Sequence, residues 1–190
     1  ADGSVNTGTS TPGSYTVTYT IAAAGGCGIV TTTSTIIIRT DGLWTGTTNT
    51  DWNTTGNWAC NSIPVITTNV VIPGSLTNYP ILGSGAAGTV NNLTIQNGAS
   101  LTVTGNILQI AGAVNNSGTF TSSGGTIELN GSSPQTIATN QFAGNTIANL
   151  IINNATGVSL AGNLNITGIL TPQLGTLSSG GYLTLVSTVA

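Results

Sequence analysis

Short apolar stretches recur along the chain and alternate with polar positions. In residues 15–21 the odd positions carry Tyr, Val, Tyr and Ile, and the even positions carry Thr. Residues 35–39 contain a second β-branched run, and a glycine-rich segment at 25–28 lies between the two. Alternation with a period of two is typical of a strand with one buried face, and clustered glycines mark turns. The pattern predicts an antiparallel hairpin within residues 1–40.

The pattern changes at Asp41. Beyond the tryptophan-containing segment 44–58, the chain becomes a succession of very short apolar pairs separated by Asn-Gly, Ser-Gly and Gly-Gly turns. The pairs lie at residues 93–95, 101–103, 127–129, 150–152, 164–166 and 183–185. Strands of three to five residues are shorter than those of most β-sandwiches. Such strands suit a solenoid, in which each coil contacts only its neighbours.

An internal repeat supports the solenoid. Residues 92–97 (NLTIQN) match residues 149–154 (NLIINN), an offset of 57, and the register holds as far as residues 118–120. The offset slips to 56 where residues 124–129 match 180–185. We expect each repeat to hold two or three coils. The predicted fold is all-β, with a parallel β-solenoid (β-helix) and its tryptophan-rich cap over residues 41–190, preceded by strands in residues 1–40.

The composition excludes whole classes of function. The chain has Thr 36, Gly 27, Asn 21 and Ser 17 but neither Lys nor His, and its charged residues are Asp2, Arg39, Asp41, Asp51 and Glu128. One arginine cannot neutralise a nucleic-acid backbone. Zinc sites need His or clustered Cys, and the usual Ser-His-Asp or Cys-His catalysis needs a base. We therefore expect no catalytic residues, no metal, no cofactor and no nucleic-acid partner.

The scarcity of charge does not indicate disorder or a membrane span. The hydrophobic fraction is 38% and the net charge is only −3, whereas disorder combines low hydrophobicity with high net charge. No stretch of 18 apolar residues is present, and the first residues lack the pattern of a signal peptide. In a parallel stack, like charges in a ladder repel, whereas Asn and Thr ladders form hydrogen bonds. We hypothesise that this favours uncharged polar residues on the coils.

Two segments resemble one group of proteins. The run WTGTTNTDWNTTGNW at 44–58, followed by VVIP at 70–73 and NYPI at 78–81, resembles the entry to repetitive regions of Bacteroidota surface proteins. Residues 12–38 resemble the Ig-like repeats of gliding-motility adhesins, which the type IX secretion system exports. The resemblance implies that residues 1–40 are terminal strands of an Ig-like β-sandwich.

The resemblance also implies a function. It places the chain in a large, extracellular, non-enzymatic adhesin of the cell surface, whose partners are neighbouring repeats of the same protein and surface glycans or like subunits. Two alternatives stay open. One is a subunit of a self-assembling extracellular filament, and the other is a carbohydrate-binding β-helix.

The tryptophan segment holds the candidate binding residues. Trp44, Trp52 and Trp58 could stack on sugar rings. The hydrogen bonds to the sugar could come from Asn49, Asp51, Asn53 and Asn57. We favour the other interpretation, in which the three rings cap the end of the solenoid core.

Asp41 and Asp51 are a weak pair for a glycosidase, because Asp in such turns commonly accepts backbone N–H bonds. We expect Glu128, between two apolar residues, to stand alone and face solvent. The Thr-x-Thr runs suggest an ice-binding array. In the second copy of the 57-residue repeat, however, Ser159 and Ala161 stand at the positions of Thr102 and Thr104, so the array is interrupted.

The two cysteines, Cys27 and Cys60, form a candidate disulfide. An extracellular chain with two cysteines permits one bond, which would join the hairpin to the tryptophan segment. The alternative is that the two cysteines do not pair with each other. For a loop of about 34 residues, the chain-entropy model gives roughly 3.5–4 kcal/mol of stabilisation.

Overall fold

The chain forms two compact units. A computed structural model describes residues 13–38 and 40–186, and its units are Ala1–Thr40 and Asp41–Ala190. The division falls at the residue where the hydrophobic pattern changes. Asp2 and Arg39 lie outside the described residues, as does the end of the strand expected after residue 185.

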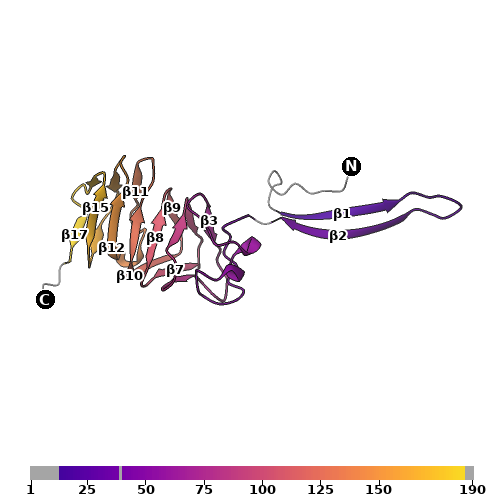
Figure 1. The fold of residues 1–190 in the computed structure, drawn as a ribbon, viewed down its shortest axis with the longest axis horizontal. Helices are drawn as coiled ribbons and strands as arrows, with labels where there is room; N and C mark the ends of the chain where they lie inside the picture. The colour runs from indigo at the N-terminus through magenta and orange to yellow at the C-terminus, as the bar shows by residue number, and fades with distance from the viewer. Residues whose placement is uncertain (1–12, 39, 187–190) are drawn as a thin grey trace. The chain divides into compact units, whose positions relative to one another are not determined.

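The first unit contains an antiparallel hairpin, as the alternating pattern predicts. Strand β1 (Gly13–Ile21) pairs with β2 (Val30–Ile38) over their full lengths, and an isolated bridge joins Ala24 to Cys27 in the connecting turn (Figure 1). Gly25 and Gly26 have φ angles of 60° and 89°. Glycine adopts these angles without steric cost, so the two glycines allow the chain to reverse direction here.

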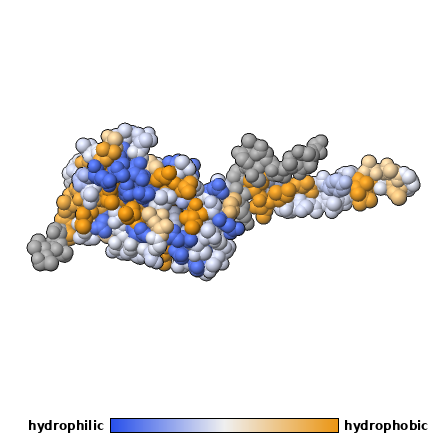
Figure 2. Space-filling view, in the orientation of Figure 1, coloured by the Kyte–Doolittle hydropathy of each residue, from blue (hydrophilic) through white to orange (hydrophobic). Residues whose placement is uncertain are grey.

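One face of the hairpin carries apolar side chains that are exposed within this unit. Tyr15, Val17, Tyr19 and Ile21 are 43–65% exposed, and apolar surface is visible along the hairpin in Figure 2. The sequence predicts that this face is half-buried, but no element among the described residues of the unit covers it. The structure shows the antiparallel pair, and the Ig-like sandwich stays a prediction.

The second unit is a parallel β-solenoid, as predicted, and it has about six coils (Figure 1). Its strand pairings fall into three rows, which we call the first, second and third faces. The first face contains two sheets, made of β3 (Val70–Ile72), β6 (Leu93–Ile95) and β9 (Val114–Asn116), then β11 (Gln135–Ile137), β13 (Val158–Leu160) and β16 (Leu177–Ser178).

The second and third faces share two long strands. The second face contains β4 (Ile81–Leu82), β7 (Ser100–Val103), β14 (Leu164–Ile166) and β17 (Leu183–Leu185), with the first parts of β10 (Thr119–Leu129) and β12 (Thr146–Asn153). The third face contains β5 (Gly88–Val90), β8 (Ile107–Ile110), the second parts of β10 and β12, and β15 (Leu170–Leu174).

Strand β10 is longer than the sequence predicts because it turns the corner between two faces without ending. Its 11 residues include a register shift between Ser122 and Thr126. At this corner Gly124 and Gly125 pass close to the preceding coil, where a Cβ on either residue would meet the backbone oxygen of Thr104 or Asn106. Only glycine permits such a close approach between coils.

The 57-residue repeat relates strands that lie on different faces. Paired residues in neighbouring coils are 19 to 25 positions apart, as for Thr119 with Ser100 and Ile147 with Ser122. An offset of 57 therefore spans between two and three coils, as expected. It matches β6 on the first face with the second part of β12 on the third face. What repeats is the strand-and-turn unit, shifted by one face, and not the whole coil.

The core of the solenoid is continuous from coil to coil. Strands such as β6 and β13 alternate buried and half-buried positions, and the inward aliphatic side chains of all three faces form one cluster. Phe120 and Phe142 belong to the same cluster, with ring centroids 4.7 Å apart. Phe142 comes from the loop after β11, immediately before the 3-10 turn η3 (Ala143–Asn145).

Candidate functional site

The tryptophan segment forms the first coil of the solenoid. Leu43 bridges to Val71 on the first face, and Asp51 bridges to Ile81 on the second, both in parallel. The segment then turns back on itself through η1 (Thr55–Asn57) and η2 (Ala59–Asn61), where Trp44 and Trp58 form an antiparallel bridge. This return closes the outer edge of the first coil, because Asn57 and Leu43 carbonyls accept bonds from the N–H groups of Thr45 and Ala59.

The three indoles are stacked edge to face inside this coil. The centroid of Trp58 lies 4.9 Å from that of Trp44 and 4.7 Å from that of Trp52, at interplanar angles of 84° and 74°. Edge-to-face pairs at this separation are favourable beyond the area they bury. The Nε1 of Trp58 donates to the Trp52 carbonyl at 2.8 Å, and that of Trp44 donates to the Asn78 carbonyl at 2.8 Å.

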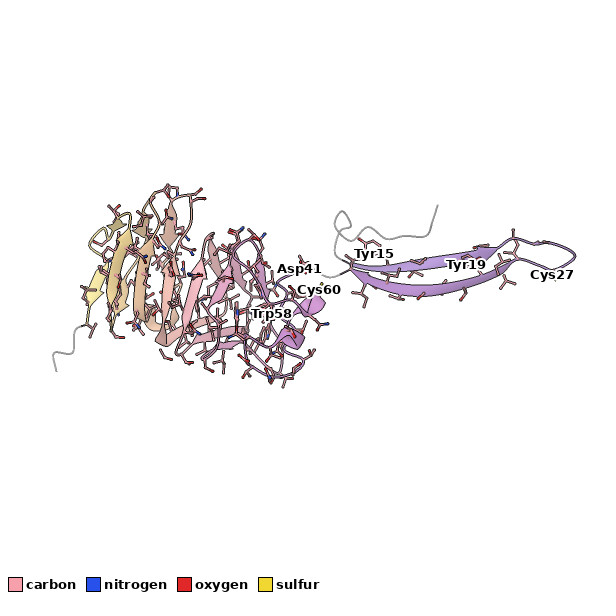
Figure 3. The ribbon with its side chains drawn as sticks, viewed as in Figure 1. Tyr15, Tyr19, Cys27, Asp41, Trp58 and Cys60 are labelled. Atoms are coloured by element: carbon pink, nitrogen blue, oxygen red, sulfur yellow. The ribbon has the colours of Figure 1, made fainter. Side chains whose placement is uncertain are left out.

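The sugar-platform hypothesis for these tryptophans is wrong for this conformation. Trp44 and Trp52 are 0% exposed and Trp58 is 2% exposed, so no indole face is open to a sugar ring. Figure 3 labels Trp58 in this coil. The rings belong to the core cluster, in agreement with the favoured interpretation of the segment as a cap. Their clustering in the sequence is explained by packing, because one coil must cover the apolar end of the stack.

Asn57 holds the turn of the first coil, whereas the sequence suggests it as a hydrogen-bonding residue of a sugar platform. It is fully buried, and its Oδ1 accepts from the N–H groups of Thr48 and Asn49, each at 3.0 Å. Its Nδ2 donates to the Asn49 Oδ1 at 2.7 Å and to the Asp51 carbonyl at 2.8 Å. The side chain thus makes all four bonds of which an Asn is capable.

The two aspartates of this region, Asp41 and Asp51, are both exposed. The Asp51 carboxylate accepts from the Asn53 N–H and from the Thr54 hydroxyl, each at 3.1 Å, as expected of an Asp in a turn. Within residues 13–38 and 40–186, no group of three or more His, Cys, Asp or Glu side chains is placed to hold a metal ion.

Glu128 lies in a different environment from the one expected. The sequence suggests a solitary side chain in solvent, but the residue is only 6% exposed. Its Oε2 accepts from the Gln109 Nε2 at 2.8 Å, and its Oε1 accepts from the Asn153 Nδ2 at 2.7 Å. These partners come from β8 and β12, so the carboxylate links three successive coils on the third face.

We predict that Glu128→Ala destabilises the solenoid by about 1–3 kcal/mol, because it leaves two half-buried amide donors without an acceptor. Urea unfolding of the full chain would measure the effect. Thr121→Ala, also on β10, is the matched control and should change stability by less than about 0.5 kcal/mol. Equal effects for the two variants would contradict the linking role of the carboxylate.

Uncharged polar side chains form hydrogen bonds between coils, in agreement with the hypothesis drawn from the composition. At one corner, Asn69 Oδ1 accepts from the side-chain amides of Asn91 and Asn92, at 3.0 and 2.9 Å. The hydroxyls of Thr136 and Ser159 are 3.0 Å apart on the first face. A threonine array for ice does not form at Thr102, whose paired neighbours are Ile81 and Thr121.

The candidate binding surface of the solenoid is a hollow on the first face, where the row of strands is interrupted. It has a volume of about 330 Å³ and is lined by residues 111–114 and 133–136. A second hollow of about 170 Å³ shares Pro134 and Gln135 and continues along β13 and β16. The regular spacing of the short strands is interrupted at this point in the sequence, where Gly-Ser-Ser-Pro precedes β11. This interruption alone does not predict a hollow.

A buried amide network anchors this surface. The Nε2 of Gln135 donates to the Ile110 and Gly112 carbonyls, both at 2.9 Å. Its Oε1 accepts from the Gly131 N–H and from the Asn154 Nδ2, also at 2.9 Å. Gln135 is 7% exposed and Asn154 is fully buried. Neither residue can be recognised from the sequence, because an amide side chain in a Thr- and Asn-rich chain carries no distinguishing pattern.

The cysteines lie in different units, and their pairing stays a prediction. Both are exposed, Cys27 in the hairpin turn and Cys60 in η2 (Figure 3). If they pair, iodoacetamide added to the native, unreduced chain should leave both unmodified, and mass spectrometry should show two alkylations only after reduction. Two alkylations without reductant would contradict the disulfide, since exposed thiols react readily.

These features define a parallel β-solenoid whose first coil is closed by three buried tryptophans. A family model described as Domain of unknown function (DUF8693) matches residues 43–147. The match covers 105 of 190 residues and runs from the first coil to the start of β12. The chain therefore belongs to this family. No curated protein and no solved structure matches the chain. No helix among the described residues is long and apolar enough to cross a membrane.

Proposed function

We infer that the chain is a non-enzymatic structural segment of a large extracellular adhesin at the cell surface, similar to the gliding-motility adhesins that the type IX system exports. The observation that carries this proposal is that the distinctive side chains of the solenoid make their contacts within the stack of coils. The tryptophans fill the first coil, Glu128 joins three coils, and Asn57 and Gln135 have all their hydrogen-bonding capacity satisfied internally. Each of these groups supports a stack, which is what a stalk requires.

The Ig-like sandwich is part of the same proposal. A two-stranded hairpin alone is marginally stable in water. The exposed apolar row of β1, with Tyr19 at 65% and Ile21 at 54%, is the kind of face that a second sheet covers in a sandwich. An adhesin with Ig-like repeats before a solenoid would supply that sheet.

A replacement experiment in the producing cells tests the proposal. Antibodies against the folded chain should label intact cells, and deletion of residues 41–190 should reduce attachment. Insertion of an unrelated β-solenoid of the same length in their place should restore attachment, because a stalk acts through its length and stiffness. Labelling only after permeabilisation, or a failure of the replacement to restore attachment, would contradict the proposal.

A self-assembling filament is the second candidate, favoured by the last described coil. There β15, β16 and β17 each pair with a strand on one side only, and Leu174 and Leu185 are 51% and 57% exposed. An exposed edge of this kind is a template for pairing with another chain. Electron microscopy of the purified chain would distinguish the candidates, since only a filament shows a repeating axial rise.

A further inference from the structure

The row of strands on the first face is broken between β9 and β11. These strands belong to consecutive coils, yet they lie in separate three-stranded sheets, whereas β10 pairs with β7 on the second face and with β8 on the third face across the same coils. The 330 Å³ hollow lies at this break, lined by residues 111–114 beside β9 and 133–136 beside β11. We call this place the first-face gap.

Both walls of the gap present unused backbone groups. In a parallel ladder, alternate residues direct their N–H and C=O groups to opposite neighbours. The Leu93 N–H donates to the Ala113 carbonyl, and the Ser117 N–H donates to the Ile95 carbonyl. The backbone groups of residues 113, 115 and 117 thus point towards β6. The N–H and C=O groups of Val114 and Asn116 therefore point towards the gap.

The opposite wall has the same property. The Gln135 N–H donates to the Gly157 carbonyl, and the Ala161 N–H donates to the Ile137 carbonyl. The backbone groups of residues 135 and 137 therefore point towards β13. The backbone groups of Thr136 consequently point towards the gap, facing those of Val114 and Asn116. Two strand edges thus face one hollow.

Side-chain amides hold the gap open at both ends. At one end the Gln135 carboxamide bonds to the Ile110 and Gly112 carbonyls. At the other end the Asn116 Nδ2 donates to the Gln141 carbonyl at 2.8 Å, and Gln141 is itself 4% exposed. These bonds take the place of the missing ladder without filling the middle. A site whose walls are fixed in advance loses little entropy when it binds.

The chemistry of the walls selects the occupant. The lining residues are Ala, Gly, Val, Ser, Pro, Gln and Thr, so they carry neither a charge nor an aromatic ring on which a sugar could stack. The volume is at the lower end of the range of about 300–1,000 Å³ for ligand sites. Paired rows of backbone donors and acceptors match another strand. We propose that the first-face gap binds a short, extended peptide segment with small, uncharged side chains, which adds a strand between β9 and β11.

A blocked tripeptide tests this proposal, which goes beyond the structural role. Acetyl-Thr-Val-Thr-amide is titrated into the ¹⁵N-labelled full chain. Saturable amide shifts are expected at residues 114–116 and 136, with a Kd of about 1 mM, because the contact is small. Acetyl-Pro-Pro-Pro-amide lacks the internal N–H donors and should not produce them. N-acetylglucosamine is the third probe. Shifts of these amides with the sugar and not with Thr-Val-Thr would overturn the proposal.

Matched variants localise the site. Ala113 and Ser133 lie on opposite walls and are both exposed, so Ala113→Trp and Ser133→Trp fill the gap without entering the core. Each should weaken tripeptide binding at least about tenfold. Ala87→Trp, at an exposed alanine outside the hollow, should leave binding unchanged. Tripeptide shifts that are absent in the parent chain, or that persist in both gap-filling variants, would refute the proposal.

Discussion

Replacement of Trp58 by alanine should destabilise the solenoid by about 3–5 kcal/mol, the cost of emptying a buried aromatic position. Trp58 is 2% exposed, packs edge to face on two other indoles and donates to the Trp52 carbonyl. Because coils contact only their neighbours, the damage should begin at the first coil. Urea unfolding gives the magnitude, and amide exchange should show residues 43–58 losing protection first.

A comparison of phenylalanine variants at Trp52 and Trp58 isolates the contribution of one hydrogen bond. Within the described residues, the Trp52 Nε1 has no hydrogen-bond partner, whereas the Trp58 Nε1 has one. Trp58→Phe should therefore cost about 1 kcal/mol more than Trp52→Phe, since only Trp58→Phe removes a hydrogen bond. Thr50→Ala, at an exposed residue of the same coil, is the surface control. A loss below about 1 kcal/mol for Trp58→Ala would mean that the indoles do not form the cap.

Asn57→Ala should cost about 3 kcal/mol although it removes no apolar surface. The change deprives two backbone N–H groups of their acceptor and two oxygens of their donor in the turn of the first coil. Unsatisfied groups of this kind cost about 1–3 kcal/mol each, and the exposed ones regain water. Urea unfolding measures the loss.

Asn57→Asp separates the two halves of this network. It keeps an acceptor for Thr48 and Asn49 but replaces the donating amide with an oxygen that faces the Asn49 Oδ1 and the Asp51 carbonyl. We therefore expect it to be as destabilising as the alanine variant. Asn53 is half-buried, and its side chain donates to two carbonyls through bonds that are exposed to solvent. Asn53→Ala should therefore cost less. Comparable stability for Asn57→Asp and the parent chain would contradict the assignment.

The solenoid could be predicted from the sequence because its signal is local. Short strands at 93–95, 164–166 and 183–185 occur where the apolar pairs predict them. The arrangement of coils into faces could not be predicted, because a 57-residue similarity between strand units does not say which strands pair. The length of β10 could not be predicted for a related reason. Gly124-Gly125 has the composition of a turn, yet these residues pack against the preceding coil and the strand continues through them.

The polar residues were harder to interpret than the apolar ones. The tryptophan cluster is visible in the sequence, but whether an indole faces solvent or core depends on the turn that Asn57 holds. The environment of Glu128 depends on Gln109 and Asn153, which are 19 and 25 residues away and become neighbours only through the stacking of coils. The first-face gap depends likewise on the fit between two coils.

The central claim is that the chain from Asp41 onward is a parallel stack in which polar side chains join neighbouring coils. Interstrand nuclear Overhauser contacts in the labelled full chain test it most directly. We predict sequential rows of contacts between paired residues such as Leu93 with Val114 and Val158 with Leu177, and none between Val114 and Gln135 across the gap. Strong Hα–Hα contacts between the short strands, which characterise antiparallel pairing, would contradict it.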